Sequence, residues 1–175
     1  MFKIFHIFIM TLILFGVRNA SARSKSTIEK IGDYTQVIVP AYAFGMAISE
    51  DGWTGAKQFA YSFGAMEATV YGLKYVVEER RPNKADNRSF PSGHTASAFS
   101  GATFIHARYG LMPALVPYIM AGFTAYSRIH ANKHWWWDTL AGASIAGIMS
   151  YTFVDRRNGV SVSANPQYVG FKATF

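Results

Sequence analysis

Four short stretches of the sequence contain the side chains that a phosphate-transfer site needs. They are Lys74 to Pro82, Pro91-Ser92-Gly93-His94, Ser127-Arg128, and His134 with Asp138. The side chains of interest in them are three cations (Lys74, Arg81 and Arg128), two histidines, the Asp138 carboxylate and a glycine at an expected helix start. Fixed cations can hold a phosphate group, and an oriented histidine can accept it. The four stretches in this order are the strongest functional signal in the chain.

The first stretch predicts two phosphate-holding cations near a helix end. Lys74 and Arg81 are seven residues apart, so on one helix both would project from the same face. Arg81 offers a planar fork for two phosphate oxygens, and Lys74 offers a mobile point charge. Pro82 is expected to end the helix. The alternative is a solvated basic helix end, because other cations lie nearby: Arg80, Lys84 and Arg88.

The second stretch predicts the start of a helix that faces an anion. Ser92 is a plausible N-cap, and the amides of Gly93 and His94 would then point at the anion. His94 would lie at the rim as a proton donor. The alternative is an ordinary capped helix start with a surface histidine.

The last two stretches predict a third cation and a nucleophile. Arg128 follows an uncharged helix, where a charge needs a partner such as a bound phosphate. His134 and Asp138 have the i, i+4 spacing that places both on one helical face. A carboxylate that accepts a hydrogen bond from one imidazole nitrogen leaves the other free to attack phosphorus. The alternative is a structural His–Asp pair.

Other aromatic and titratable residues near these stretches receive lesser roles. Trp135, Trp136 and Trp137 cannot all face a core, so we expect one to pack inside and the others to wall the pocket or meet a membrane interface. Glu67 lies on an apolar helix face, with Lys74 as its candidate partner. The remaining histidines are expected to be supporting or structural: His6, His106 and His130.

The composition and the positions of Gly and Pro indicate one helical domain. The 175 residues are half hydrophobic and only 15% charged, with a net charge of +7 and no cysteine. The basic balance favours anionic partners, yet no run of Lys and Arg interleaved with aromatic residues supports nucleic acid. Gly and Pro separate five expected helices, at about 26–48, 56–80, 93–108, 111–127 and 135–154. If consecutive helices run antiparallel, all four stretches meet at one end of the bundle.

The two ends of the chain differ from this helical pattern. Residues 1–22 have a positive start, an apolar run and Ala20-Ser21-Ala22, which is typical of a signal peptide. An uncleaved membrane anchor is the alternative, and either places the remaining chain, at least in part, outside the cytoplasm. Residues 159–175 alternate polar and apolar side chains, so we expect a short β-hairpin or strand.

The motifs resemble the three-part signature of the type 2 phosphatidic acid phosphatase (PAP2) superfamily, which includes class A acid phosphatases and vanadium haloperoxidases. The signature residues are Lys74-x6-Arg81-Pro82, Pro91-Ser92-Gly93-His94 and Ser127-Arg128-x5-His134-x3-Asp138. The resemblance covers about residues 56–154. It implies an all-α bundle of about five core helices, here a domain at 23–158 followed by a tail.

The resemblance also implies a role for each signature residue. His134 would be the nucleophile that forms a phosphohistidine, and Asp138 would orient it. His94 would protonate the leaving group and then activate water. The groups that hold phosphate would be Lys74, Arg81, Ser92, Gly93 and Arg128. No metal or other cofactor is required in this scheme.

Size, signal-like start and apolar helices suit a compact, membrane-associated phosphatase of a bacterial-type cell envelope, with its site facing the periplasm or exterior. The expected substrate is a lipid-linked phosphate or diphosphate, such as phosphatidic acid, lipid A or polyprenyl diphosphate. One alternative is a soluble, periplasmic or secreted acid phosphatase that hydrolyses small phosphate esters. Another is a phosphate-binding or transport component without turnover.

Overall fold

The computed structural model describes residues 24–156, 159–165 and 168–174, so the expected signal peptide lies outside the described residues. Four helical elements form the bundle: α2 (Ser24–Val76), α3 (Gly93–Tyr109), α4 (Leu111–His130) and α5 (Trp136–Phe153). Strands β1 (Gly159–Asn165) and β2 (Tyr168–Thr174) pair antiparallel as a hairpin after α5. The fold is an all-α bundle, as the sequence predicts.

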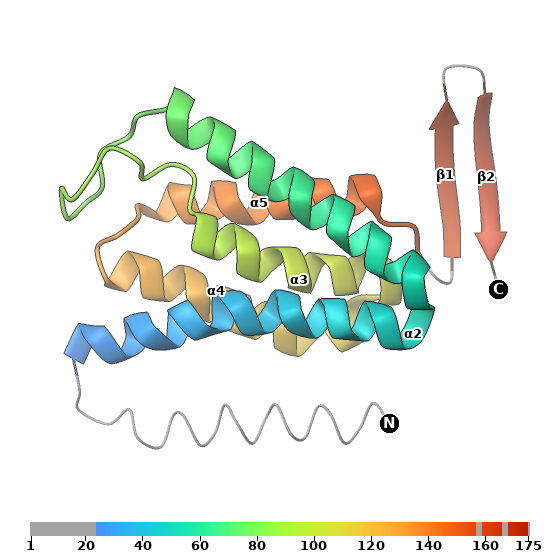
Figure 1. The fold of residues 1–175 in the computed structure, drawn as a ribbon, viewed down its shortest axis with the longest axis horizontal. Coiled ribbons are helices and arrows are strands. Elements are labelled where there is room, and N and C mark those ends of the chain that lie inside the picture. Colours follow the sequence, from blue (N-terminus) through green and yellow to red (C-terminus); the bar gives the residue numbers. More distant parts are fainter. Residues whose placement is uncertain (1–23, 157–158, 166–167, 175) are drawn as a thin grey trace.

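α2 is two helices that meet at a kink. Gly52 has φ 56° and ψ −133°, a conformation that side-chain-bearing residues rarely adopt. The kink folds the element back on itself, and we call residues 24–51 its first arm and residues 53–76 its second arm. Counted this way, α2 accounts for two of the five expected helices. Figure 1 shows the two arms joined at one end of the bundle and separated at the other.

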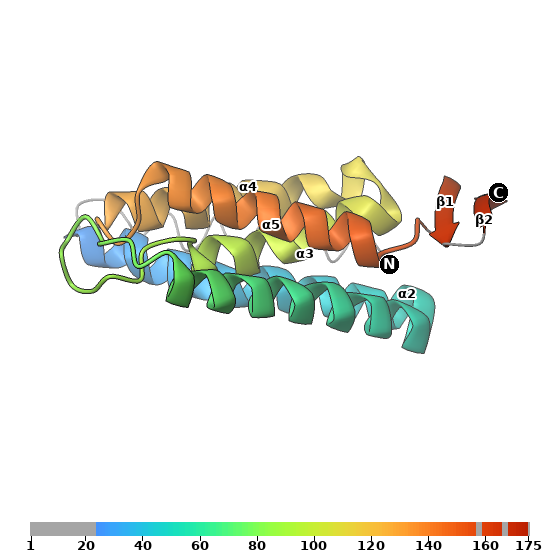
Figure 2. The ribbon, with the colours of Figure 1, turned by 90° about the horizontal axis from the view of Figure 1, so that it is seen from above.

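α3 lies at the centre of the bundle. Figure 2 shows the α2 arms in one layer, α4 and α5 in the other, and α3 between them. α3 packs against α2, α4 and α5. Its small residues allow this close packing: a Cβ on Gly101 would lie 2.6 Å from the Val39 carbonyl oxygen of the first arm. Apolar clusters around Phe104, Ala98 and Ala96 fill the space on its different sides.

The end of the bundle opposite the separated arms is held by a buried ionic cluster. Arg108, near the end of α3, donates to Asp51 at 2.6 Å and to Gln58 at 2.7 Å. Its guanidinium also donates to the backbone carbonyl of Asp155 at 2.9 Å, and the Tyr109 hydroxyl donates to Asp51 at 2.7 Å. The cluster therefore joins α3 and the chain after α5 to the kink of α2.

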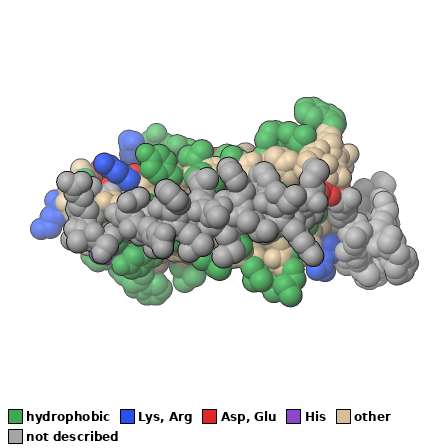
Figure 3. Space-filling model, turned by 90° about the horizontal axis from the view of Figure 1, so that it is seen from below, with side chains coloured by type: hydrophobic (Ala, Val, Ile, Leu, Met, Phe, Trp, Pro, Cys, Tyr) green, Lys and Arg blue, Asp and Glu red, His purple; other side chains and the backbone are tan. Residues whose placement is uncertain are grey.

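Large hydrophobic side chains remain exposed along the helices. Figure 3 shows them on both flanks of one face, and the most exposed include Met112, Val76, Trp53 and Ile119. None of the helices described by the structure is both long enough and apolar enough to span a membrane.

Candidate active site

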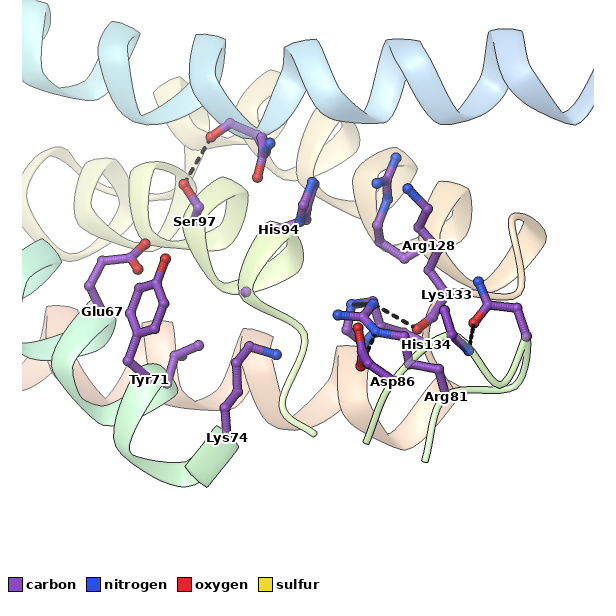
Figure 4. Close-up of a pocket in the computed structure, with 15 residues that line it drawn as sticks. Glu67, Tyr71, Lys74, Arg81, Asp86, His94, Ser97, Arg128, Lys133 and His134 are labelled. Atoms are coloured by element: carbon purple, nitrogen blue, oxygen red, sulfur yellow. Dashed lines mark hydrogen bonds and ion pairs between the residues drawn. The ribbon is translucent and has the colours of Figure 1, made fainter. Parts of the chain in front are cut away.

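A pocket of about 650 Å³ lies between the two arms of α2, above the start of α3 (Figure 4). Six of the eight predicted site residues line it: Lys74, Arg81, Gly93, His94, Arg128 and His134. The other two, Ser92 and Asp138, are fully buried. The prediction that the four stretches meet at one end of the bundle is therefore confirmed. The contacts that bring them together differ in several places from those expected.

His134 and Asp138 lie together, although not on one helix. α5 begins at Trp136, so His134 belongs to the loop before it, and the expectation of a shared helical face is wrong. His134 Nδ1 nevertheless lies 3.4 Å from Asp138 Oδ2, and both side chains are buried. This separation is slightly longer than an ordinary N–H···O hydrogen bond. Asp138 therefore faces Nδ1 and leaves Nε2 on the pocket side.

Asp138 is held in place by the helix start that contains it. Its Oδ2 accepts hydrogen bonds from Ser89 Oγ at 2.5 Å and from the Trp135 backbone N–H at 2.8 Å. Its backbone carbonyl accepts from the Ser92 N–H at 3.0 Å, which ties α5 to the start of α3. Burial alone would raise the pKa of Asp138, but these hydrogen bonds and the nearby His134 hold it below its ordinary value. Asp138 is therefore a fixed anion behind His134.

Arg81 contacts the pocket face of His134. Arg81 Nη1 lies 3.2 Å from His134 Nε2 and donates to the Lys133 carbonyl at 3.1 Å. Because guanidinium only donates, this contact and the Asp138 carboxylate assign the proton to Nδ1 and the lone pair to Nε2. Burial lowers the pKa of His134, and Arg81 lowers it further, so the neutral form is favoured.

Lys74 and Arg81 do not share a helix face, which corrects the sequence prediction. α2 ends at Val76, six residues before Pro82. Arg81 lies in the following loop because its N–H pairs with the Asp86 carbonyl and its Nε donates to the Asp86 carboxylate at 2.7 Å. Lys74 Nζ donates to the carbonyls of Pro91 at 2.6 Å and Arg88 at 3.1 Å. Burial, followed by the charge of Arg81, lowers the pKa of Lys74 to about 8.

Ser92 and His94 begin α3 as the sequence predicts. Ser92 is the N-cap, and its hydroxyl accepts from the Thr95 N–H at 3.5 Å. His94 lines the pocket, with its Nε2 3.2 Å from Asp33 Oδ1. Burial and then the Arg128 charge lower the pKa of His94 to about 4, while Asp33 acts in the opposite direction.

Arg128 is fully buried in the last turn of α4 and has protein partners for its guanidinium. It donates to Ser127 Oγ at 3.0 Å, to Asp33 Oδ1 at 2.7 Å and to the Glu29 carbonyl at 2.6 Å. A Cβ on Gly32 would lie 1.9 Å from Ser127 Oγ, so only glycine allows the first arm to approach this closely. The charge partner expected for Arg128 is thus supplied within the chain by Asp33.

The first arm contributes site residues that sequence reasoning missed. Asp33 contacts His94 and Arg128, and Glu29 pairs with Lys133, which also lines the pocket. The local sequence gives little signal, because Asp33 is one of several charged residues in the first turns of α2. Asp33 and Arg128 are 95 positions apart, so the pairing depends on how the arm folds back.

The three tryptophans stabilise the loop before the site instead of packing in the core. The Trp135 and Trp137 rings stack with centroids 5.1 Å apart. Their indole N–H groups donate to the Arg80 carbonyl at 3.0 Å and to Glu79 at 2.8 Å. All three side chains are exposed, so the expectation that at least one is buried is wrong. Trp135 and Trp137 stay at the surface because the acceptors of their indole N–H groups lie there.

His106 and His130 do not line the pocket. His106 Nδ1 contacts the Tyr118 hydroxyl at 3.0 Å, and His130 contacts that of Tyr126 at 3.4 Å, whereas His6 lies outside the described residues. Within the part of the chain that the structure describes, no three His, Asp or Glu side chains are grouped to hold a metal ion.

Two bacterial lipid A phosphatases resemble this chain. A lipid A 1-phosphatase of Porphyromonas gingivalis is 39% identical over 89 residues, which are 49% of this chain but only 20% of the relative. A lipid A 4'-phosphatase of Helicobacter pylori is 29% identical over 140 residues, covering 74% of this chain and 70% of the relative. The chain thus spans about a fifth of the length of the first relative.

Two solved structures share the fold. The crystal structure of Aquifex aeolicus LpxE has a TM-score of 0.60 at 23% identity, covering 81% of this chain and 92% of that one. A transmembrane PAP2-type phosphatidylglycerolphosphate phosphatase from Bacillus subtilis has a TM-score of 0.52 at 20% identity, covering 87% and 94%. The model of the PAP2 superfamily matches residues 55–158, more than half of the chain and all three motifs. The chain therefore belongs to the PAP2 superfamily.

Proposed function

We propose that this chain is a phosphatase that hydrolyses lipid-linked phosphate through a phosphohistidine on His134. The observation that carries the proposal is the position of His134 between Asp138 and the pocket. Nδ1 faces the buried carboxylate, and Nε2 faces a cavity lined by cations: Lys74, Arg81, Arg128 and Lys133. A neutral imidazole held in this way is a nucleophile directed at an anion-binding site.

The first step transfers the phosphoryl group to the enzyme. The lone pair of His134 Nε2 forms a bond to phosphorus, and the bond from phosphorus to the leaving oxygen breaks. The leaving oxygen takes a proton from His94, and Asp138 stabilises the positive charge on the His134 ring. The pKa of His94 is about 4 in the free protein, and the negative charge of a bound phosphate would raise it.

The second step releases phosphate. Neutral His94 takes a proton from water, the water oxygen attacks phosphorus, and the bond between phosphorus and His134 Nε2 breaks. Lys74 and Arg81 stabilise the charge on the equatorial oxygens in both steps. Arg128, held by Asp33 and Glu29, adds a fixed positive charge to the same side of the pocket.

Two observations support a lipid-linked substrate. The relatives named above are lipid A phosphatases, and one structural neighbour is a phosphatidylglycerolphosphate phosphatase. In addition, large apolar side chains are exposed along the helices, which is unusual for a protein that contacts only water. We therefore propose that the protein associates with a membrane of the bacterial cell envelope and that its site faces the periplasm or exterior. Phosphatidic acid, lipid A and polyprenyl diphosphate are the candidate substrates.

The test is an assay of the purified protein, with a chelator present, on a long-chain lipid phosphate and a soluble aryl phosphate. We expect faster turnover of the lipid, and radiolabelled phosphate trapped on the wild-type protein in an acid-labile bond. His134→Ala should abolish both turnover and label. His130→Ala is the matched control, because this histidine contacts Tyr126 and does not line the pocket, so the variant should retain activity.

Other outcomes would separate the alternatives. A preference for the aryl ester would indicate a broad acid phosphatase. Phosphate binding without hydrolysis of either substrate would indicate a binding or transport component. Activity retained in His134→Ala would overturn the mechanism.

A further inference from the structure

The pocket is larger than a phosphate group requires. Its volume of about 650 Å³ is in the range of sites that enclose whole small-molecule ligands. The phosphate-holding side chains occupy only one part of its wall. The rest of the wall has two sides. Both arms of α2 and α3 contribute Gln36, Glu67, Val70, Tyr71 and Ser97, and the loop after α2 contributes Asn83, Ala85 and Asp86. The side formed by α2 and α3 offers one place for the group that is attached to the phosphate.

The phosphate-holding part of the pocket and the side formed by α2 and α3 differ in their charged side chains. Figure 4 shows Arg81, Lys133, His134 and Arg128 on one side of His94, and Glu67 with Tyr71 on the other. Glu67 lies two helical turns before Lys74, which corresponds to about 10 Å along the second arm. We call the part formed by Glu67, Tyr71, Gln36 and Ser97 the Glu67 subsite. A carboxylate there repels a second anionic group on the ligand.

The Glu67 carboxylate is only partly buried in the wall of the pocket. Burial raises its pKa, and the charge of Lys74 only partly opposes this. Among the described residues, no side chain or backbone group donates a hydrogen bond to it, unlike the neighbouring Asp33 and Asp138. Because partial burial disfavours the charged form of Glu67, a ligand that donates hydrogen bonds to the carboxylate would stabilise that form.

The neighbouring groups can both donate and accept hydrogen bonds. Tyr71 follows Glu67 by one helical turn on the same arm, so its hydroxyl lies on the same face. Across the pocket, Ser97 Oγ donates to the Gln36 carbonyl at 2.9 Å and keeps its own oxygen as an acceptor. A carboxylate, a phenol and a serine hydroxyl around one space suit a ligand rich in hydroxyl groups.

We propose that the Glu67 subsite binds the sugar of a phosphorylated glycolipid, with Glu67 accepting hydrogen bonds from hydroxyl or amide N–H groups of that sugar. The inference rests on the proposed function, since it assumes that the phosphoryl group lies at His134. It also selects among the candidate substrates. Phosphatidic acid and polyprenyl diphosphate carry no such donors beside the phosphate, whereas a sugar phosphate does.

The test compares two inhibitors of aryl phosphate hydrolysis, inorganic phosphate and N-acetylglucosamine 1-phosphate. We expect the sugar phosphate to inhibit the wild-type protein at a concentration at least about tenfold lower, because hydrogen bonds to a charged group are strong. Glu67→Gln should remove most of this difference and Glu67→Ala all of it, with phosphate inhibition unchanged within about twofold. Glu78→Gln, an exposed carboxylate after α2, is the matched control.

The assay is run near pH 6, about two units below the pKa of Lys74, so that this lysine stays protonated in every variant. Equal inhibition of the wild type by both ligands, or equal losses for both in the Glu67 variants, would overturn the subsite. Calorimetric titration with the same two ligands measures their binding without turnover. A protein inactive on all esters would therefore contradict the proposed function, while the calorimetry would still decide whether Glu67 binds the sugar.

Discussion

The carboxylate of Asp33 lies 3.2 Å from Nε2 of His94, although the two residues come from different helices. The same oxygen accepts a hydrogen bond from Arg128 at 2.7 Å. Asp33 raises the pKa of His94 against the effects of burial and Arg128. The first arm of α2 thus controls the protonation of the residue proposed to act as the acid.

Replacing Asp33 with Asn should slow the hydrolysis of alkyl phosphates. Loss of the carboxylate lowers the pKa of His94 further, so less of it is protonated at any pH above about 4. For an alkyl ester, whose leaving group needs a proton, we expect kcat to fall about threefold to tenfold. An ester of 4-nitrophenol leaves without protonation and should be affected less than about twofold.

Glu29→Gln is the control for this comparison. It removes the partner of Lys133 from the same arm but keeps the Glu29 carbonyl that Arg128 contacts. Equal effects of Asp33→Asn on both esters would show that Asp33 acts on the fold or on phosphate binding and not through His94.

The pKa of Lys74 predicts the alkaline limit of activity. Because burial and Arg81 lower it to about 8, Lys74 loses its charge as the pH rises through this value. Phosphate binding should weaken there, so we expect kcat/KM to fall above about pH 8 in a pH–rate profile. Lys74→Arg should shift this fall in kcat/KM to higher pH, since a guanidinium group stays charged. If kcat/KM of this variant falls at the same pH as in the wild type, the titrating group is not Lys74.

Two glycines of the first arm should respond oppositely to alanine. A Cβ at Gly32 would clash with Ser127 and come within 2.8 Å of the Arg128 guanidinium, whereas at Gly45 it meets nothing within 4 Å. We expect Gly32→Ala to destabilise the protein by about 1–3 kcal/mol and to impair turnover. Gly45→Ala should stabilise it by about 0.5–1 kcal/mol. Denaturant unfolding measures both, and similar results at the two positions would contradict the close approach.

Removing Arg108 should affect stability and leave the chemistry unaffected. Its ion pair with Asp51 is buried, with side-chain exposures of 7% and 10%, at the end of the bundle opposite the site. Arg108→Ala leaves Asp51 buried without this partner, which typically costs about 3–5 kcal/mol. Lys57→Ala, at an exposed position nearby, should change stability by less than about 0.5 kcal/mol. A large loss of kcat in folded Arg108→Ala protein would show that this cluster influences the site.

The sequence predicts the helices and their shared end because Gly, Pro and Ser92 mark the boundaries locally. Ser92 caps α3 as expected, and the motif residues meet where antiparallel helices bring them. The errors concern the loops between α2 and α3 and between α4 and α5, which contain Arg81, His134 and Trp135. Arg81 pairs with Asp86, a contact that no helical periodicity reveals. The roles proposed for the motif residues stay predictions until the variants are measured.

The contacts from the first arm could not be predicted for a different reason. Asp33 and Arg128 are joined because α2 folds back at Gly52. One glycine in a long helical pattern does not specify the direction in which the chain turns. Glu67 was recognised as a carboxylate on an apolar face, but its position in the pocket depends on the same fold. Local patterns thus identify the side chains, while the tertiary contacts decide which of them share a site.

The kink at Gly52 joins the two arms of α2 that border the pocket. Asp33 lies 19 residues before it, so the first arm extends about 28 Å from the kink to the site. A rotation of only about 5° at Gly52 would move Asp33 by about 2.5 Å relative to the second arm, which carries Glu67 and Lys74. The Arg108 cluster bonds directly to Asp51, the residue before this kink. A small change of angle at the far end of the molecule would therefore change the distance between two walls of the pocket.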